Sequence, residues 1–185
     1  SILSKTTYPH FEVLILDNGS VEKKTLKWLA AIQRQDSRVR VLPWRRPFNF
    51  SAINNFGVRH ARGSIVGLIN NDVEVINPDW LTEMTSHAVR PDIGCVGAKL
   101  YYGNDTVQHG GVILGIGDVA GHSHKYALRS DNGYFSRLRL VQNVSAVTAA
   151  CLLVRKQVYQ QVGGLDEQNL RVAFNDVDFC LKVRQ

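Results

Sequence analysis

The sequence lacks the features that mark membrane-spanning, secreted, disordered and nucleic-acid-binding proteins. No apolar run approaches the ~20 residues that a bilayer-spanning helix needs. Pro and Gly number only 5 and 15 among 185 residues, which argues against disorder. No Lys/Arg run with interleaved aromatic residues occurs, which disfavours nucleic acid as a partner. No basic-then-apolar leader opens the chain, so nothing indicates secretion, and we expect a cytoplasmic protein.

Cysteine is also scarce, and it is poorly placed for cross-linking or for binding zinc. Cys95, Cys151 and Cys180 are far apart along the chain and lie in apolar stretches. Because no two of them stand at metal-ligand spacing, we expect buried free thiols in a reducing compartment.

The residues that are present are typical of one globular domain. Hydrophobic residues make up 44% and charged residues 21%, and a chain of 185 residues can bury a substantial core. We therefore interpret residues 1–185 as a single domain. The first residues read as the tail of an earlier element, and the last ones as a helix without a stop signal, so we expect a piece of a longer protein. The net charge of +6 is scattered, which is compatible with an anionic diphosphate ligand and with peripheral contact at a membrane.

Apolar runs alternate with amphipathic segments along the chain. This alternation predicts an α/β fold with a mostly parallel sheet and helices on both faces. Ser20 and Ser51 are the predicted N-caps of the first two helices. The Gly- and His-rich stretch 103–141 shows only short strand-like pieces and is interpreted as a loop or a small insertion. The predicted strands are 11–16, 38–44, 64–69, 93–101 and 148–154, and the predicted helices are 21–34, 51–62, 77–89, 156–162 and 175–185.

Two of the predicted strands end in carboxylate or amide side chains. Asp17 follows the first apolar run, and Asn70, Asn71 and Asp72 follow the third. In open α/β sheets, ligands bind at the carboxyl ends of the strands. A carboxylate there can hold a divalent cation that bridges to phosphate oxygens. Each cluster is equally typical of a simple Asx turn, so that alternative stays open.

A third acidic cluster opens the last predicted helix. Asp176 and Asp178 would both stand in its first turn, where acids complement the helix dipole. One of them can instead serve as a general base for a hydroxyl, provided that it faces the pocket formed by Asp17 and Asp72. The mechanism considered below therefore requires residues 17, 72 and 176 to converge on one crevice.

Three histidines stand in the Gly-rich middle of the chain. His122 and His124 would share one face of a strand, which would suit a metal pair, and His109 precedes two glycines. Zinc needs a third and usually a fourth ligand, and no cysteine is near. We interpret these histidines as polar loop residues or as contacts to a donor or an acceptor.

The complete set of motifs follows a fixed order along the chain. The motifs are Asp17-Asn-Gly-Ser, the stretch 46–55, Asn55-Phe-Gly57, Ala61-Arg-Gly63, Leu68-Ile-Asn-Asn-Asp72, Leu153-Val-Arg155, Val162-Gly-Gly-Leu-Asp166-Glu167 and Asn175-Asp-Val-Asp-Phe-Cys-Leu181. In this order they resemble the inverting family-2 glycosyltransferases with the GT-A fold, and in particular bacterial O-antigen and rhamnosyl-type transferases. The resemblance implies a three-layer α/β/α domain with a mostly parallel sheet. It also implies a further apolar strand upstream of Ser1 that lines the nucleotide pocket.

The resemblance implies roles for five residues. Asp17, Asn54, Asn71 and Asp72 would bind the nucleotide sugar, and Asp72 would also hold the Mg or Mn ion of the diphosphate. Asp176 matches the catalytic aspartate, which deprotonates the acceptor hydroxyl as it attacks the anomeric carbon with inversion. The implied donor is a UDP- or dTDP-sugar. The implied acceptor is a polysaccharide or a lipid-linked glycan of the cell envelope, met at the inner face of the membrane.

Two departures from the family pattern leave other functions open. Asn70 and Asn71 stand where many relatives carry an acid, and Asn175 replaces the usual Glu beside Asp176. A non-catalytic sugar- or partner-binding domain would tolerate both changes. A nucleotidyltransferase on a similar sheet is a further alternative, although such enzymes usually carry a Gly-rich, Arg-containing phosphate loop that does not occur here.

Overall fold

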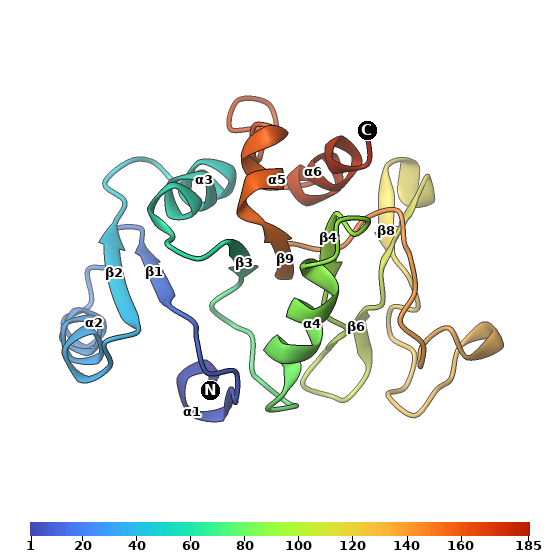
Figure 1. Ribbon diagram of the computed structural model, residues 1–185, viewed down its shortest axis with the longest axis horizontal. Helices are drawn as coiled ribbons and strands as arrows, with labels where there is room; N and C mark the ends of the chain where they lie inside the picture. The colour runs from blue at the N-terminus through green and yellow to red at the C-terminus, as the bar shows by residue number, and fades with distance from the viewer.

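The strands that carry the predicted site belong to two sheets of the computed structural model, which describes all 185 residues (Figure 1). β1 (Val13–Asp17) and β2 (Val39–Pro43) form a parallel pair. In the second sheet β9 (Cys151–Arg155) is the central strand, between β3 (Ile65–Ile69) and β4 (Cys95–Gly97). β9 runs antiparallel to both neighbours, so its amino end lies beside the carboxyl end of β3.

The segment between β4 and β9 forms two small antiparallel hairpins. β5 (Leu100–Tyr101) pairs with β6 (Val107–His109), and β7 (Val112–Leu114) pairs with β8 (Ala120–His122). β7 is also bridged to Ala146, shortly before β9. The stretch interpreted from the sequence as a loop or a small insertion therefore contains two hairpins that are attached to the central sheet region.

Six α-helices surround the sheets; of two 3-10 helices, one lies within the second hairpin and the other follows it. In Figure 1, α2 lies against the β1–β2 pair, while α4, α5 and α6 surround β9. The helices are α1 (Ile2–Lys5), α2 (Lys23–Gln35), α3 (Phe50–His60), α4 (Trp80–Ala88), α5 (Lys156–Gln161) and α6 (Asn175–Val183), with 3-10 helices at η1 (Ile116–Asp118) and η2 (Tyr134–Ser136).

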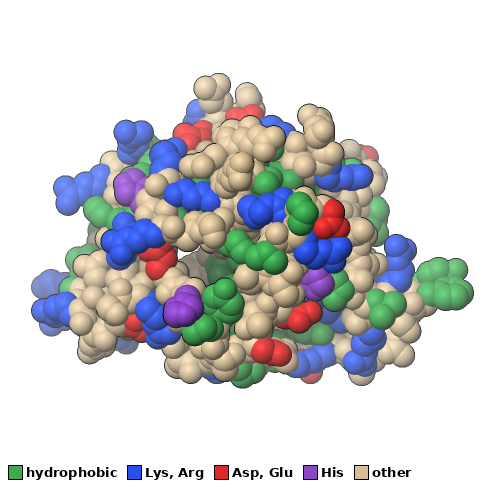
Figure 2. Space-filling view, in the orientation of Figure 1, with side chains coloured by type: hydrophobic (Ala, Val, Ile, Leu, Met, Phe, Trp, Pro, Cys, Tyr) green, Lys and Arg blue, Asp and Glu red, His purple; other side chains and the backbone are tan.

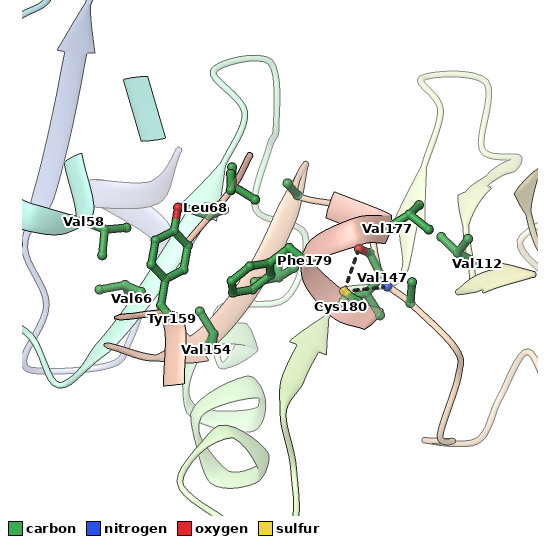
Figure 3. Close-up of a cluster of buried hydrophobic side chains, with 14 residues drawn as sticks. Val58, Val66, Leu68, Val112, Val147, Val154, Tyr159, Val177, Phe179 and Cys180 are labelled. Atoms are coloured by element: carbon green, nitrogen blue, oxygen red, sulfur yellow. Dashed lines mark hydrogen bonds between the residues drawn. The ribbon is translucent and has the colours of Figure 1, made fainter. Parts of the chain in front are cut away.

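The side chains of β9 pack against helices on both faces of its sheet. Successive side chains of a strand point to opposite faces. Leu152 and Val154 belong to the largest core cluster, together with side chains of α3, α5 and α6. Within it the rings of Tyr159 and Phe179 have centroids 4.9 Å apart (Figure 3). Leu153 faces the other way and packs with α4. Each large side chain buried here contributes roughly 1.5–3 kcal/mol to stability.

The prediction of an α/β fold is confirmed, and every predicted strand and helix has an observed counterpart. The prediction of one mostly parallel sheet is wrong, because only β1 and β2 pair in parallel and no ladder joins β1 to β3. The chain reaches β9 only after the hairpin segment. β9 then pairs between β3 and β4 and runs antiparallel to both. A crossover helix leading directly from β3 to its neighbour would instead have given a parallel pair.

Both predicted N-caps are wrong, because another residue occupies the N-cap position: Glu22 in α2 and Asn49 in α3. The N-cap of α3 is Asn49, whose side-chain oxygen accepts a backbone N–H of the first turn at 3.0 Å. Ser51 already lies inside α3, and its hydroxyl donates to the C=O of Leu170 at 2.5 Å. Ser20 precedes the start of α2, and its hydroxyl donates to the carboxylate of Asp17 at 2.5 Å.

The β1–β2 pair is less enclosed than the central sheet. All five residues of β1 are only partly buried, whereas four of the five residues of β9 are buried. β1 has a hydrogen-bonded neighbour on one side only, and so does β3. β1 and β3 are neighbours in Figure 1, and Figure 2 shows the surface hollowed between them.

The expectation of free thiols is confirmed. All three cysteines are unpaired, Cys151 and Cys180 are buried, and Cys95 is partly buried. Burial raises the pKa of Cys151 to about 11. The Lys and Arg side chains are spread over the face seen in Figure 2, in agreement with the scattered charge of the sequence. No helix combines the length and the apolar character that crossing a membrane requires.

Candidate active site

A cavity of about 350 Å³ lies where the carboxyl end of β3, the residues before β9 and the amino end of α6 meet. β7, β8, the first residue of α3 and residues 172–174 before α6 also contribute to its wall. Nine of its 15 lining residues are hydrophobic, and its polar side chains are those of Asn70, His122, Thr148, Asn175 and Asp176. Two of these, His122 and Asp176, are titratable and give the cavity its capacity for acid–base chemistry.

Asp176 is oriented by two backbone N–H groups. Its Oδ2 accepts a hydrogen bond from Ala149 at 3.0 Å, and its Oδ1 accepts one from Val177 at 2.9 Å. The next residue along, Ala150, accepts a hydrogen bond of 3.0 Å from the backbone N–H of Asn70. The short segment before β9 thus joins the start of α6 to the end of β3. A carboxylate has about four acceptor positions, so Asp176 keeps free lone pairs for a ligand.

The two acids in the first turn of α6 have different surroundings. Asp178 forms an ion pair with Lys182 one turn later on the same helix, with 2.6 Å between Oδ2 and Nζ. It does not line the cavity, whereas Asp176 does. Asn175, the neighbour of Asp176, is buried, and its amide donates to the C=O of Leu170 at 3.3 Å. Asn175 therefore anchors the segment that precedes α6.

The end of β3 brings only one of its three polar residues into the cavity. Asn70 lines it, whereas Asn71 and Asp72 are exposed and lie outside its lining. Asp72 stands two residues beyond Asn70 in the sequence, in the turn that leaves β3. Of the three acids expected to converge on one crevice, only Asp176 lines this cavity. The end of β3 reaches the cavity through Asn70, and Asp72 lies in the turn that follows.

Asp17 and Asn54 also lie outside the lining of the cavity. The Oδ1 of Asp17 accepts from both the N–H and the hydroxyl of Ser20, at 3.1 and 2.5 Å, which is the arrangement of a turn residue. The amide of Asn54 donates to the C=O of Phe50, one turn earlier in α3, at 2.8 Å. Neither residue has a recorded contact with the cavity.

One lining residue of the cavity, His122, belongs to a histidine pair that the sequence did not predict. Its Nδ1 lies 2.8 Å from Nδ1 of His109, which is only 1% exposed. β8 ends at His122, so His124 lies beyond the strand and the expected shared face does not exist. Partial desolvation and the charge of Lys125 lower the pKa of His122, against the opposing effect of Asp176.

The protein groups near β3 do not form a metal site by themselves. Across all 185 residues, no group of three or more carboxylate, imidazole or thiol side chains is arranged to hold a metal ion. Mg²⁺ is often bound by one or two carboxylates, with water and phosphate oxygens as the remaining ligands. The exposed Asp72, with the amide oxygens of Asn70 and Asn71 nearby in the sequence, fits a cation that binds together with a diphosphate.

Comparison with known proteins gives a family match over most of the chain. The model of the family called Glycosyl transferase family 2 matches residues 1–163. Uncharacterized protein y4gI of Sinorhizobium fredii (strain NBRC 101917 / NGR234) is 56% identical over 184 residues, which cover 100% of this chain. O-antigen biosynthesis protein RfbC of Myxococcus xanthus is 39% identical over 184 residues, or 99% of this chain. The chain spans only 20% and 14% of the lengths of these two relatives.

Two solved structures share the fold at low sequence identity. One is mannosyltransferase PcManGT from Pyrobaculum calidifontis in complex with GDP-Man and Mn²⁺, with a TM-score of 0.68 and 15% identity. It aligns with 98% of this chain and 46% of its own. The other is GalNAc-T7 with UDP, GalNAc and Mn²⁺, with a TM-score of 0.67 and 14% identity over 93% of this chain and 34% of its own.

Proposed function

Because the chain belongs to glycosyl transferase family 2, we propose that residues 1–185 form the catalytic domain of a longer enzyme that transfers a sugar from a nucleotide-diphosphate sugar to an acceptor hydroxyl. The observation that carries this proposal is the position of Asp176. Its carboxylate lines the cavity at the end of β3 and is oriented by the N–H of Ala149. Ligands of open α/β sheets bind at strand ends of this kind.

In the proposed reaction Asp176 is the general base. Its carboxylate takes the proton of the acceptor hydroxyl while that oxygen attacks the anomeric carbon of the donor sugar. The bond between this carbon and the diphosphate oxygen breaks, and the nucleoside diphosphate departs with the electron pair. Since attack occurs opposite the leaving group, the product has the inverted configuration. The two backbone N–H groups on Asp176 hold the carboxylate in one orientation, which lowers the entropic cost of reaching this geometry.

The diphosphate is proposed to bind at the turn after β3. Asp72 would hold an Mg or Mn ion there, and such an ion stabilises the charge of the departing diphosphate. Asn71 and Asn54 are proposed as polar contacts to the donor, and Asp17 as the contact to its base. These assignments are supported by the match of the family model over residues 1–163 and by the exposed position of Asp72.

We propose a glycan of the bacterial cell envelope, or its lipid-linked precursor, as the acceptor. The support is the 39% identity to a protein named for O-antigen biosynthesis. The donor is proposed to be a UDP- or dTDP-sugar, and UDP is bound in one of the structures with the same fold. The net charge of +6 suits both the anionic donor and a peripheral position at the inner face of a membrane that carries the acceptor.

We also propose that the strand which the family resemblance places upstream of Ser1 lies between β1 and β3. Each of these strands has a free edge, and free edges are ready to pair with another strand. All five β1 residues are only partly buried, as expected for a strand whose second edge is unpaired. Extending the chain at its amino end should raise the urea midpoint of unfolding, and an unchanged midpoint would contradict this placement.

The decisive experiment compares two isosteric variants of the full-length protein. Asp176→Asn should lower the rate of sugar transfer at least roughly a hundredfold, because general-base catalysis is typically worth that much. Asp178→Asn is the matched control, since its carboxylate is paired with Lys182 and lies outside the cavity. It should retain most of the activity. Binding of the donor should change little in either variant.

The same assay separates the proposed activity from its alternatives. Full transfer activity in Asp176→Asn would show that another group is the base. Release of pyrophosphate from a nucleoside triphosphate, with no glycoside formed, would indicate a nucleotidyltransferase. Metal-dependent donor binding without transfer by the unmodified full-length protein would indicate a binding domain that has kept the fold.

A further inference from the structure

The two histidines at the cavity form a chain of hydrogen bonds with a defined direction. The chain starts at the backbone N–H of Thr148, which points at Nε2 of His109 over 3.4 Å. A backbone N–H can only donate. The Nε2 of His109 is therefore the acceptor and carries no proton. His109 is 1% exposed, so no water replaces this contact.

The position of the proton on His109 determines the tautomer of His122. A neutral imidazole carries one proton, and that of His109 must be on Nδ1 because Nε2 accepts. Nδ1 of His109 lies 2.8 Å from Nδ1 of His122, so it donates and His122 accepts there. A neutral His122 then carries its own proton on Nε2. Its Nδ1 is occupied, which leaves Nε2–H as the group that His122 offers to a ligand in the cavity.

Protonation of either ring would break this arrangement. A proton added to His122 would set two N–H groups against each other across 2.8 Å, and one added to His109 would face the N–H of Thr148. Burial and the neighbouring His122 lower the pKa of His109 to about 4. Partial burial is the main cause that lowers the pKa of His122. Of the charged groups that face it, Lys125 in the turn after β8 lowers the pKa further, whereas Asp176 of α6 raises it, and the net direction is downward.

We propose that His122 is a neutral hydrogen-bond donor to an oxygen of the bound substrates, and that buried His109 is the positioning residue that fixes its tautomer. The inference rests on the proposed function for the identity of the substrates. The oxygen belongs either to the diphosphate of the donor or to a hydroxyl of the acceptor. With Nδ1 occupied and Nε2 protonated, His122 has no free lone pair to take a proton, which leaves Asp176 as the base among the titratable groups of the cavity.

The tautomers are tested directly by nitrogen NMR on histidine-labelled protein. At pH 8 the spectra should show His109 protonated on Nδ1 and His122 protonated on Nε2. On acidification the pKa of His122 should prove to lie below the ordinary value of about 6.5. In His109→Leu the donor to His122 is lost, so His122 should titrate with a pKa closer to the ordinary value of about 6.5. In His109→Asn an amide replaces the Nδ1–H donor and should keep His122 neutral.

The control for the NMR experiment is His124→Ala. His124 bonds to the hydroxyl of Ser123 and does not line the cavity, so its removal should leave the tautomer of His122 unchanged. A His122 ring that is protonated on Nδ1, or that titrates in unmodified protein as it does in His109→Leu, would overturn the proposal. This readout does not depend on sugar transfer, so it stays informative if the proposed function fails.

The substrate contact is tested with two variants of His122 in the full-length protein. Binding of UDP, dTDP and GDP is measured with Mn²⁺, and the KM for the acceptor is measured in transfer. His122→Ala should weaken nucleotide binding roughly fivefold if the partner is a phosphate oxygen, or raise the acceptor KM by a similar factor if it is a hydroxyl. His122→Gln, which retains an N–H donor, should recover most of the loss. Unchanged values of both quantities in His122→Ala would refute the contact.

Discussion

The backbone N–H of Ala149 donates a hydrogen bond of 3.0 Å to Oδ2 of Asp176. Ala149 lies just before β9 and Asp176 lies in the first turn of α6, so this contact joins segments that are 27 residues apart. The adjacent Ala150 is bonded in turn to Asn70 at the end of β3. Three chain segments therefore meet at two consecutive alanines, and the orientation of the proposed base depends on the path of the chain into β9.

A methyl group at Gly97 should disturb this path. A Cβ built on Gly97 of β4 would lie 2.5 Å from Cβ of Val147, which is too close for any side-chain rotation to relieve. Gly97→Ala should therefore lower the free energy of unfolding by roughly 1–3 kcal/mol, as overpacked cores do. It should also reduce transfer activity, because Val147 leads directly to Ala149. Urea denaturation and transfer assays of the variant measure the two effects.

The control for this substitution is Gly103→Ala. No atom lies within 4 Å of a Cβ built at Gly103, so the added methyl group meets open space. Its stability and activity should match those of the unmodified protein. If Gly97→Ala and Gly103→Ala behave alike, the close packing of β4 against Val147 does not limit stability.

Asn55 should be one of the most sensitive polar residues of the fold. Its buried amide donates to the C=O of Leu165 at 2.9 Å, and its oxygen accepts from the N–H of Leu165 at 3.0 Å and from the hydroxyl of Tyr159. Asn55→Leu would leave these buried groups without partners. We expect a loss of roughly 2–4 kcal/mol in the free energy of unfolding, measured from the urea midpoint.

The neighbouring Asn54 provides the contrast. Its amide bonds only to the C=O of Phe50 within α3, so Asn54→Ala should cost less than about 1 kcal/mol. If Asn54 contacts the donor as proposed, the same variant should weaken nucleotide-sugar binding without lowering stability to a comparable degree. Equal loss of stability in the Asn54 and Asn55 variants would contradict the difference in their environments.

If the proposed function is correct, the effect of the metal ion on donor binding should depend on the carboxylate of Asp72. Asp72→Asn removes the one carboxylate at the end of β3, so binding of UDP in the presence of Mn²⁺ should weaken by roughly 10- to 100-fold. Binding without metal should change little. Glu74→Gln, which removes an exposed acid two residues further along the chain, is the matched control and should bind normally. An equal effect of the two substitutions would point to general loss of negative charge.

Stability should decrease in mildly acidic solution because His109 is buried in its neutral form. Its pKa is about 4 in the folded protein and about 6.5 in the unfolded chain, so between these values the unfolded chain binds the proton more readily. The stabilising contribution is complete above pH 6.5 and is lost as the pH falls toward 4. The loss amounts to at most about 3.4 kcal/mol.

The contribution of His109 is measured as the difference between the unmodified protein and His109→Asn in urea titrations from pH 7.5 to 4. The difference in the free energy of unfolding should shift in favour of the variant as the pH falls, since Asn does not titrate. A constant difference over this range would show that His109 does not couple protonation to folding. Protonation of Asp36 does not interfere with this measurement. Hydrogen bonds with Arg38 lower the pKa of Asp36 to about 2, so it affects stability only below about pH 3.8.

Local sequence patterns predicted most elements of secondary structure. A strand buried on both faces is a continuous apolar run, and a helix buried on one face has apolar residues at helical spacing. The run before Asp17 is β1, and the amphipathic segment that begins near Asn175 is α6. The errors occur where residues compete for one position. Asn49 caps α3 in place of Ser51, whose hydroxyl is bonded to Leu170, distant in the sequence. No local pattern reports such a contact.

The candidate site shows the same division. Sequence order and family resemblance singled out Asp176, but they could not distinguish it from Asp178 by physical environment, since both stand in a first helical turn. The ion pair of Asp178 with Lys182 and the hydrogen bond of Asp176 with Ala149 make that distinction. From the sequence His122 was considered as a loop residue, a ligand contact or a metal pair with His124. Its actual partner His109 belongs to a different hairpin.

The sequence by itself determined most of the strands and helices outside the hairpin segment, which thiols stay free and which acids stand at the ends of strands, since these properties depend on neighbours within a few residues. Only the tertiary structure decided that β9 runs antiparallel between β3 and β4, and that Asp176 and His122 line one cavity. Those outcomes depend on contacts between residues far apart in the chain, where packing and hydrogen-bond geometry select one arrangement among many with the same local patterns.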